Sequence, residues 1–449
     1  MQKGFTFDVN RCTGCEACRI ACSIENRLAP GVDWRRIHSF NPRHHPALPA
    51  LHNSMACNHC EEPACMEHCP ALAYSKDPVS GAVTIDENKC IGCKYCSWAC
   101  PYDAPQFNHR SGLMEKCTFC SQRQAEGGEP ACVALCPTGA LGFGDHETTE
   151  PATRIPGFTP TEIGPAIRFT ALRSGQPPTL FAPAVPPRVT SGQPERSKSR
   201  IGLRTEWTLL CFTFTAALLV AWVATAALAG VVPRPEFVLP AGLAAMALST
   251  LHLGRKTRAW RAVLNLRRSW LSREVLLFPA FLTLAGAAAF TNDAAGSWTW
   301  AATLTGFAAL FAMDRVYGVT RTPGLALHSA QLLLTGLLFT GLIGSNTFLA
   351  VSVSILKMVL YLGRKTRFVR EGRTRRPLTS LLRLGLLLPA WIAPSTTDPA
   401  VLYVLVLLAV AAGELIDRAE YYLEMDPPSP GKQLALDLAE SLTAPRGAR

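Results

Sequence analysis

Two stretches of this chain decide its fold: CTGCEACRIAC, residues 12–22, and CIGCKYCSWACP, residues 90–101. Both space four cysteines as C-x2-C-x2-C-x3-C, and two further groups keep the ends of this pattern but stretch its middle. Sixteen of the 17 cysteines fall into these four groups. The groups are Cys12, Cys15, Cys18 and Cys22; Cys57, Cys60, Cys65 and Cys69; Cys90, Cys93, Cys96 and Cys100; and Cys117, Cys120, Cys132 and Cys136.

The spacing is that of iron–sulfur ligands. Cysteines separated by two residues can turn their thiolates onto adjacent corners of one cube, and the third cysteine completes the loop. The fourth lies on the helix that follows and points away, so it ligates a different cluster. Proline follows the last cysteine in three groups, as Pro70, Pro101 and Pro137. Four groups with crossed fourth ligands predict four [4Fe–4S] clusters.

Two other uses of cysteine compete with this interpretation. Structural zinc favours isolated C-x2-C pairs without the third cysteine and the trailing Cys-Pro. Disulfides favour small secreted scaffolds, whose cysteines rarely cluster this densely. The spacing favours iron–sulfur clusters over both.

Composition divides the chain into two halves. Its 449 residues suggest about two or three domains. Cysteine, proline and charge dominate before about residue 200, and leucine-rich and alanine-rich apolar stretches follow. The net charge of +11 lies largely in arginines between membrane-length apolar segments, so it indicates loops at a membrane surface and no nucleic-acid partner.

The first half is predicted to be an α+β ferredoxin-like domain over residues 1–185. Short strands over residues 5–9 (FTFDV) and 82–87 (AVTIDE) precede the first and third cysteine groups, so a two-cluster unit is repeated. Residues 145–200 are rich in proline and predict little regular structure. A basic linker over residues 186–204 ends this part, with the charges Arg196, Lys198, Arg200 and Arg204.

Histidines lie in and around the cysteine groups. The insert at residues 26–54 carries His38, His44, His45 and His52, and its prolines predict a solvent-exposed loop and no metal site. His59, His68 and His109 lie near the expected ligands. We expect them to tune hydrogen bonding to sulfur and not to ligate iron.

The second half, residues 205–449, is predicted to be an all-α membrane bundle of eight transmembrane helices, because a spanning helix needs about 20 mostly apolar residues. Cys211, in the first segment, is expected to be an apolar filler. The eight segments are Trp207–Ala229, Phe237–Leu253, Val275–Thr291, Ser297–Met313, Ala330–Gly344, Phe348–Leu362, Leu378–Ile392 and Val401–Ile416.

The loop charges are distributed unequally. Basic runs lie at residues 255–273 and 364–376, with Arg315 and Arg321 after the fourth segment, whereas the opposite loops offer only Arg234. The positive-inside rule therefore predicts a multi-pass protein of the bacterial cytoplasmic membrane whose iron–sulfur domain faces the cytoplasm. The first ten residues, MQKGFTFDVN, contain neither a signal-peptide core nor a twin arginine.

The chain resembles a fusion of two subunits of the dimethyl sulfoxide reductase family of molybdenum enzymes. All four cysteine groups match the four-cluster electron-transfer subunit, although nitrate reductase, formate dehydrogenase and polysulfide reductase share that pattern. The second half is similar to the eight-helix membrane anchor subunit. The matching stretches are STLHLGRKTRAWRAVLNLRRSWLSRE (Ser249–Glu274), MDRVYGVTRTP (Met313–Pro323) and GELIDRAEYY (Gly413–Tyr422).

The resemblance implies a cofactor arrangement. The molybdopterin cofactor of the family lies in a separate catalytic subunit, so this chain is expected to be a redox subunit whose partner performs the substrate chemistry. Groups one and four share two clusters in such relatives, and groups two and three share the other two. Carried over, the four ligand sets are Cys12, Cys15, Cys18 and Cys136; Cys22, Cys117, Cys120 and Cys132; Cys57, Cys60, Cys65 and Cys100; and Cys69, Cys90, Cys93 and Cys96.

A quinone site, for menaquinone or ubiquinone, is expected at the helix ends on the cluster side. A quinone headgroup needs hydrogen-bond donors beside an apolar slot, and quinol oxidation needs a group that takes protons. No haem is expected, because only His252 and His328 lie near the segments. Lys357, inside the sixth segment, is expected to snorkel or to pair with an acid, and a role in a proton route is a less favoured alternative. The candidate quinone residues are His252, Arg255, Arg258, Arg261, Arg273, Glu274, Arg315, Tyr317, Glu414 and Arg418.

These expectations describe a membrane-bound subunit that relays electrons between a molybdopterin partner and the quinone pool, in anaerobic respiration as in dimethyl sulfoxide reductase or in sulfite oxidation as in cytoplasm-facing sulfite dehydrogenases. Two alternatives remain. In one, the helices are a passive anchor and a soluble carrier takes the electrons. In the other, the helices translocate ions, although few acids are expected inside them.

Overall fold

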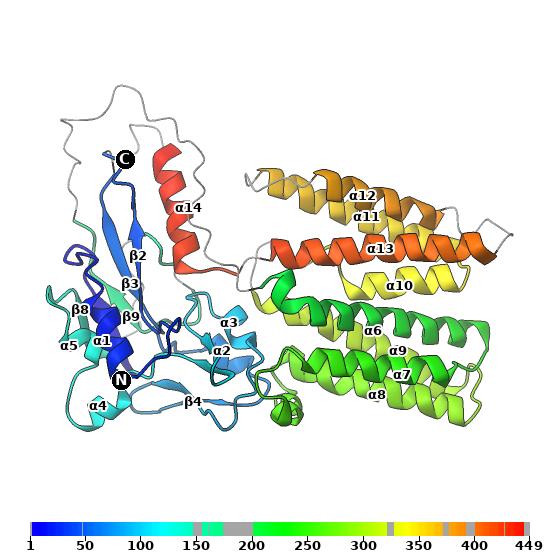
Figure 1. The fold of residues 1–449 in the computed structure, drawn as a ribbon, viewed down its shortest axis with the longest axis horizontal. Coiled ribbons are helices and arrows are strands. Elements are labelled where there is room, and N and C mark those ends of the chain that lie inside the picture. The colour runs from blue at the N-terminus through cyan, green and yellow to red at the C-terminus, as the bar shows by residue number, and fades with distance from the viewer. Residues whose placement is uncertain are drawn as a thin grey trace. The chain divides into compact units, whose positions relative to one another are not determined.

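The computed structural model describes residues 2–46, 48–146, 155–159, 161–173, 201–320, 327–370, 377–391, 400–425 and 427–443. Its contacts divide the chain into two units (Figure 1). Unit 1 comprises Met1–Arg200 and Pro427–Arg449, and unit 2 comprises Ile201–Asp426. Several basic residues of the expected linker and loops lie outside the described residues: Arg196, Lys198, Arg200, Arg321, Arg373, Arg375 and Arg376.

A three-stranded sheet brings distant parts of unit 1 together. Strand β1 (Gln2–Phe7) pairs antiparallel with β8 (Leu141–His146) and parallel with β9 (Ile167–Phe169). β1 begins before the strand expected over residues 5–9, because its first residues already pair with β8. Of the residues 145–200, in which little regular structure is expected, Ile167–Phe169 form the short strand β9, whose backbone pairs with the open edge of β1.

Three two-stranded hairpins complete the strands of unit 1: β2 (Arg36–Phe40) with β3 (Leu51–Met55), β4 (Tyr74–Lys76) with β5 (Val83–Ile85), and β6 (Gln106–Asn108) with β7 (Leu113–Glu115). The first hairpin corrects the expected exposed loop over residues 26–54. Pro42, Pro46 and Pro49 of that insert lie between the strands and Pro30 precedes β2, so none of them removes a ladder hydrogen bond. Ser39 pairs with His52 across the ladder, and Ser39 Oγ lies 2.9 Å from His52 Nδ1.

The two cysteine loops with ferredoxin spacing fold alike. Gly14 and Gly92 occupy the same place in the two loops and have φ of 72° and 69°, a left-handed conformation that favours glycine. Glu16 and Lys94 follow, also left-handed, and the helices α1 (Ala17–Glu25) and α3 (Tyr95–Ala99) begin directly after them. Three other short helices are α2 (Ala64–Glu67), α4 (Ser121–Ala125) and α5 (Ala131–Ala134).

The last helix, α14 (Pro430–Thr443), belongs to unit 1 and packs on β2 (Figure 1). Asp437 Oδ2 accepts a hydrogen bond of 2.8 Å from the backbone N–H of Gly157, and Thr159 Oγ1 donates to Gln433 Oε1 over 3.0 Å. Residues 427–449 therefore group with the cysteine-rich half and not with the helical half in which the sequence places them.

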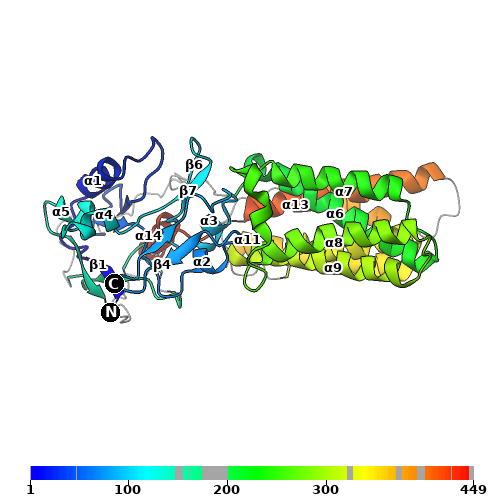
Figure 2. The same ribbon diagram turned by 90° about the horizontal axis from the view of Figure 1, so that it is seen from below.

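Helices lie at all eight segments expected in unit 2 (Figures 1 and 2). Within the described residues, three helices are long and apolar enough to cross a membrane, Thr205–Ala229, Trp270–Phe290 and Thr347–Arg367, and Leu332–Ile343 is a shorter apolar helix. These helices indicate association with a membrane. The helices are α6 (Leu203–Ala229), α7 (Pro235–Thr250), α8 (Trp270–Phe290), α9 (Ser297–Tyr317), α10 (Leu332–Ile343), α11 (Thr347–Arg370), α12 (Pro377–Leu387) and α13 (Ala400–Glu424).

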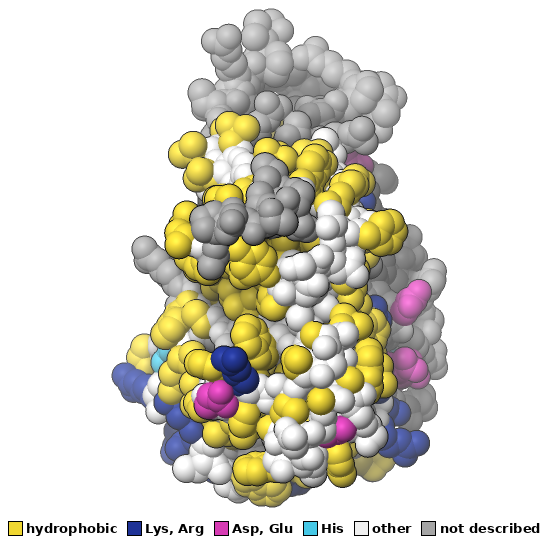
Figure 3. Space-filling model, turned by 90° about the vertical axis from the view of Figure 1, so that its right-hand side faces the viewer, with side chains coloured by type: hydrophobic (Ala, Val, Ile, Leu, Met, Phe, Trp, Pro, Cys, Tyr) yellow, Lys and Arg dark blue, Asp and Glu magenta, His cyan; other side chains and the backbone are white. Residues whose placement is uncertain are grey.

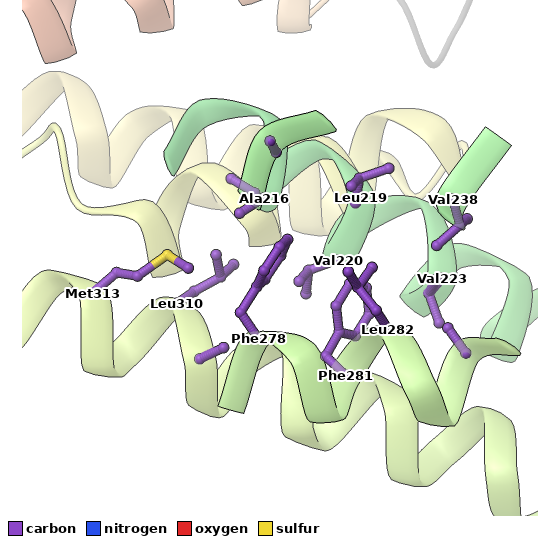
Figure 4. Close-up of a cluster of buried hydrophobic side chains, with 14 of the residues drawn as sticks. Ala216, Leu219, Val220, Val223, Val238, Phe278, Phe281, Leu282, Leu310 and Met313 are labelled. Carbon is purple, nitrogen blue, oxygen red and sulfur yellow. The ribbon is translucent and has the colours of Figure 1, made fainter. Parts of the chain in front are cut away.

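Two apolar cores hold unit 2 together, and α6 contributes to both. In the core shared by α6, α7, α8 and α9, Val220 of α6 meets Phe278 and Phe281 of α8 (Figure 4). Gly306 of α9 lets the helices approach closely: a Cβ there would lie 2.8 Å from Val220 Cγ2 and 3.0 Å from Phe281 Cδ2. The second core joins α6 to α10, α11 and α13.

The two ends of unit 2 differ in charge. The end that faces the viewer in Figure 3 shows mostly hydrophobic and uncharged side chains, with few charged ones. The described arginines of the opposite end lie in and around η2 (Lys256–Val263), a 3₁₀-helix, and near the end of α11. This is the asymmetry that the loop sequences predict.

Candidate functional site

Three of the four predicted ligand sets surround hollows in unit 1. Site 1 has Cys12, Cys15, Cys18 and Cys136 around one hollow. Site 3 has Cys57, Cys60, Cys65 and Cys100 around a second. Site 4 has Cys69, Cys90, Cys93 and Cys96 around a third. In each hollow, three cysteines come from one group and the fourth from another, as crossed ligation requires.

Site 2 comprises Cys22, Cys117, Cys120 and Cys132. Cys22 lies close enough to Cys120 and Cys132 for their charges to act on it. The charges of Cys22 and Cys132 act in the same way on Cys117. The side-chain amide of Asn26 donates to Cys22 Sγ at 3.7 Å and to Cys120 Sγ at 3.9 Å. The helices α1 and α5, which pack together, therefore bring the first and fourth groups to one place.

The chemistry of the thiols fits a cationic cofactor. Burial raises the pKa of Cys22 to about 12, and it raises the pKa of Cys117 and Cys60 well above the usual value for a thiol. Thiolates can gather in these buried places only beside positive charge, which iron supplies. Among the described residues, no group of three or more His, Cys, Asp or Glu side chains is placed to hold a single metal ion. Four thiols around each hollow match the ligand count of a [4Fe–4S] cluster.

Backbone N–H groups also point at the ligand sulfurs. His59 N lies 3.5 Å from Cys57 Sγ, Phe119 N lies 3.4 Å from Cys117 Sγ, and Ala73 N lies 3.4 Å from Cys69 Sγ. Hydrogen bonds to cluster sulfur stabilise the thiolate and help to set the reduction potential.

The histidines near the ligands contact other protein groups. His59 Nδ1 accepts a hydrogen bond of 2.8 Å from Val83 N. His68 makes an edge contact with Tyr95, and His109 makes one with Phe107. That the three histidines tune hydrogen bonding to sulfur and do not ligate iron stays a prediction.

Six of the ten predicted quinone residues lie at or near the surface of unit 2. Arg273 stacks over Trp270, 4.1 Å from the ring centroid, and donates to two backbone carbonyls. Arg315 lies over the same ring at 5.5 Å. The six residues are His252, Arg255, Arg258, Arg261, Arg273 and Arg315.

Three other predicted residues come together in the interior. Glu274 is 7% exposed, Tyr317 4% and Arg418 2%. Arg418 lies 3.9 Å from Asp314 Oδ1, and both charges act on Glu274. The structure therefore joins residues of α8, α9 and α13 that the sequence assigns only to the same side of the membrane.

A tyrosine–arginine cluster surrounds this group. The Arg418 guanidinium lies 4.9 Å from the ring centroid of Tyr317, 5.5 Å from that of Tyr421 and 5.4 Å from that of Tyr422. The hydroxyls of Tyr317 and Tyr422 share a hydrogen bond. Sequence reasoning missed Tyr421 and Tyr422, although they follow Arg418 by about one helical turn.

Glu414, the tenth predicted residue, lies apart in a buried ion chain. Lys357 Nζ is 2.9 Å from Glu414 Oε2, so the lysine pairs with an acid as expected. Arg383 Nη2 lies 2.6 Å from Glu414 Oε1 and 3.3 Å from Asp417 Oδ2. Arg364 lies 2.7 Å from Asp417 Oδ1 and 3.1 Å from Glu424 Oε2. The members, in order, are Lys357, Glu414, Arg383, Asp417, Arg364 and Glu424.

The buried charged residues of unit 2 correct two expectations. The sequence predicts Arg364 in a loop, but α11 continues to Arg370, and Arg364 is buried within it. The sequence also predicts few acids inside the helices, yet Glu274, Glu414 and Asp417 are all buried. The spacing of the acids on α13 at three-residue and four-residue intervals could have shown one acidic face, since such residues share a side of a helix.

Comparison with known proteins identifies the first half. Residues 50–146 match the family described as a 4Fe-4S dicluster domain. A subunit of the anaerobic dimethyl sulfoxide reductase of Escherichia coli is 46% identical over 151 residues, covering 32% of this chain and 73% of the relative. A subunit of the sulfite dehydrogenase of Allochromatium vinosum is 38% identical over 165 residues, covering 32% and 69%.

A third relative, a subunit of the tetrathionate reductase of Salmonella typhimurium, is 37% identical over 155 residues. The match covers 33% of this chain and 59% of the length of the relative. The similarity to these relatives lies in the N-terminal third and does not extend over the helices. The fold, the thiol sites and these relatives agree on a [4Fe–4S] electron-transfer protein. Through its N-terminal third, this protein belongs to the iron–sulfur subunits of the dimethyl sulfoxide reductase family.

Proposed function

We propose that this chain relays electrons between a molybdopterin-containing catalytic subunit and the membrane quinone pool through four [4Fe–4S] clusters. The observation that carries the proposal is the gathering of sixteen cysteines into four sets with crossed ligands. The partner performs the substrate chemistry, on a sulfoxide, sulfite or tetrathionate, the substrates in the names of the relatives.

Metal analysis tests the cluster assignment. The purified protein, kept anaerobic, should hold about sixteen iron and sixteen acid-labile sulfide per chain if four cubes are filled. Cys136→Ser should remove one cluster, whereas Cys211→Ser should remove none, because Cys211 lies on α6. A colourless protein that binds zinc in place of iron contradicts the proposal.

The quinone site is proposed at Glu274, Tyr317 and Arg418, with the surface group of His252, Arg255, Arg258, Arg261, Arg273 and Arg315 beside them. Hydroxyl and guanidinium groups are donors suited to a quinone oxygen, and Glu274 is a group that could take a proton. Glu274→Gln, His252→Ala and Arg258→Ala should lower quinol-linked turnover and inhibitor binding. Arg234→Ala, at the opposite end of unit 2, is the control. If quinol-linked turnover and inhibitor binding survive all three changes, the quinone site is wrong. If the wild-type protein turns over with a soluble carrier and not with quinol, the helices are a passive anchor.

The division of the chain is proposed as an electron-transfer domain over residues 1–185, a basic linker over residues 186–204 and a membrane part that begins at residue 205. The proposal includes eight crossings and a cytoplasm-facing first domain, supported by the charge difference between the two ends of unit 2. Single cysteines introduced at Asp293 and at Arg268 test the orientation. An impermeant thiol reagent applied to intact cells should label only the cysteine at position 293.

Ion translocation is a second candidate function, favoured by the buried ion chain. It runs from Lys357, which is fully buried, to Glu424, which is partly exposed, through ion pairs of at most 3.3 Å. Buried charges in membrane helices are often sites of ion or proton movement. A pH change in sealed vesicles during turnover, absent from Lys357→Met, supports it. Turnover without a pH change leaves the buried ion chain a structural network.

A further inference from the structure

Two cations are buried between the cysteine sites of unit 1. Arg35 is 2% exposed and Lys116 is 3% exposed, and no other arginine or lysine among the described residues of this unit is fully buried. We propose that Arg35 and Lys116 are potential-setting residues, each of which stabilises the reduced form of the two clusters that it separates. The proposal rests on the proposed assignment of clusters to sites 1 to 4.

Arg35 lies between sites 1 and 2. Its Nη1 donates to Ser54 Oγ at 3.0 Å, and that hydroxyl lies 3.4 Å from Cys18 Sγ of site 1. On the other side, Cys132 of site 2 is the thiol whose charge acts on Arg35 most strongly. Phe5 covers the guanidinium, 4.6 Å from the ring centroid. Nε and Nη2 are buried and have no hydrogen-bond partner, so they remain available to acceptors at the two sites.

Lys116 lies between sites 2 and 3. It lines the hollow of site 3, and it precedes Cys117 of site 2. Its Nζ donates to the backbone carbonyls of Cys117, at 3.0 Å, and Val83. Cys57 and Cys65 of site 3 and Cys117 of site 2 are the thiols whose charges act on it.

Neither cation has a carboxylate partner among the described residues: their hydrogen bonds go to hydroxyl and carbonyl oxygens and to the thiols of Cys132 and Cys57. A buried charge without a counter-charge is costly. A [4Fe–4S] cluster with four thiolates is an anion in both oxidation states, and it gains one more negative charge on reduction. Each cation therefore has its counter-charge in the adjoining clusters, and it favours the state with the added electron.

The junction between sites 3 and 4 is different. The neutral side chain of Tyr74 lies there, within reach of Cys65 of site 3 and of Cys69 and Cys96 of site 4. The effect of the two cations therefore differs from site to site. Arg35 acts on sites 1 and 2, Lys116 acts on sites 2 and 3, and site 4 lies next to neither.

Potentiometric titration of the full-length, cluster-loaded protein, followed by electron paramagnetic resonance, tests the inference. Arg35→Gln should lower the midpoint potentials of two clusters, each by at least about tenfold in the one-electron equilibrium, or about 59 mV. Lys116→Gln should lower the midpoint potentials of two clusters, and one of these is also lowered by Arg35→Gln. Arg35→Lys should change the potentials of its two clusters less than Arg35→Gln does, because lysine keeps the positive charge. Arg36→Gln is the matched control: Arg36 pairs with Asp103 at 2.6 Å and is half-buried.

The iron content separates the possible failures. Wild-type protein with fewer than four clusters contradicts the proposed function and not the role of the cations. Full iron in Arg35→Gln and Lys116→Gln, with all potentials matching Arg36→Gln, overturns the inference. If a glutamine variant loses iron while Arg35→Lys or Lys116→Arg retains it, the positive charge is needed and the inference holds. If the charge-conserving variants lose iron as well, side-chain shape and not charge is responsible, and the inference fails.

Discussion

The imidazole of His59 stacks on the ring of Phe119, with centroids 3.5 Å apart and planes inclined by 23°. His59 lies between Cys57 and Cys60 of site 3, and Phe119 lies between Cys117 and Cys120 of site 2. Because His59 Nδ1 accepts from Val83 N, the neutral ring carries its proton on Nε2. One aromatic contact thus joins the cysteine loops of two neighbouring sites.

Replacing His59 with alanine should loosen both loops. Aromatic pairs contribute about 0.5–1.5 kcal/mol beyond the area that they bury. We therefore expect His59→Ala to release iron to a chelator faster than wild type, from two clusters and not from all four. His109→Ala is the control, because His109 is exposed and contacts only the edge of Phe107 among described aromatic rings. Equal release rates in both variants would show that the stack does not stabilise the sites.

Glycine 14 should be intolerant of a side chain. It has φ of 72°, and a Cβ there would lie 2.8 Å from the His52 ring. Gly14→Ala should reduce iron at site 1, because the cysteine loop must shift. Gly31→Ala is the matched control: φ is 85° but no atom lies within 4 Å of the added Cβ. Iron analysis distinguishes the two, and equal iron in both variants contradicts the prediction.

Glu414 should matter more for stability than Lys357. Removing one partner of a buried ion pair costs about 3–5 kcal/mol, because a charge is left uncompensated. Glu414→Gln deprives both Lys357 and Arg383 of a partner, whereas Lys357→Met leaves Glu414 paired with Arg383 at 2.6 Å. In detergent, Glu414→Gln should have a lower midpoint temperature of unfolding than Lys357→Met. The midpoint of Arg367→Gln, at an exposed position, should be close to that of wild type. The reverse order would mean that the lysine holds the network together.

His38 should make the docking of α14 sensitive to acid. Burial lowers the pKa of His38 to about 4, and the neighbouring Arg36 lowers it further whereas Asp103 opposes this. Unfolded histidine, with a pKa of about 6.5, binds more protons between these values, so stability falls as the pH falls from about 6.5 to 4. Because His38 Nδ1 lies 3.4 Å from a Cβ built on Gly431, limited proteolysis should release α14 more readily at pH 5 than at pH 7. His38→Gln should show a smaller difference, and an unchanged difference contradicts the assignment.

The sequence predicts the cluster domain well because ligand spacing is local. The reach of a thiolate limits how Cys90, Cys93 and Cys96 can be used, whatever the rest of the chain does. Which fourth cysteine completes each site depends on packing between distant segments, and only the resemblance to a known family supplies it. Sequence reasoning does not predict the strand β9 or the β2–β3 hairpin. The proline content of a segment indicates only its local backbone preference, whereas strand pairing depends on a partner elsewhere in the chain.

In unit 2 the apolar segments predict the helices but not what their buried polar groups contact. Glu414 and Asp417 lie one turn apart on α13, so a shared face could be foreseen. Their partnership with Arg383 of α12 and Arg364 of α11 depends on how three helices pack. The sequence assigns Arg364 to a loop because charge usually ends a membrane segment, and that rule fails where a partner neutralises the charge.

The return of α14 to β2 has a consequence for biosynthesis. A ribosome makes residues 430–443 after every helix of unit 2. Unit 1 therefore lacks α14 until the hydrophobic half has been translated. Metal loading that begins early therefore takes place on a partly assembled domain, whose surface at β2 is still bare. Any factor that inserts iron has that interval to gain access, and the interval ends when α14 docks.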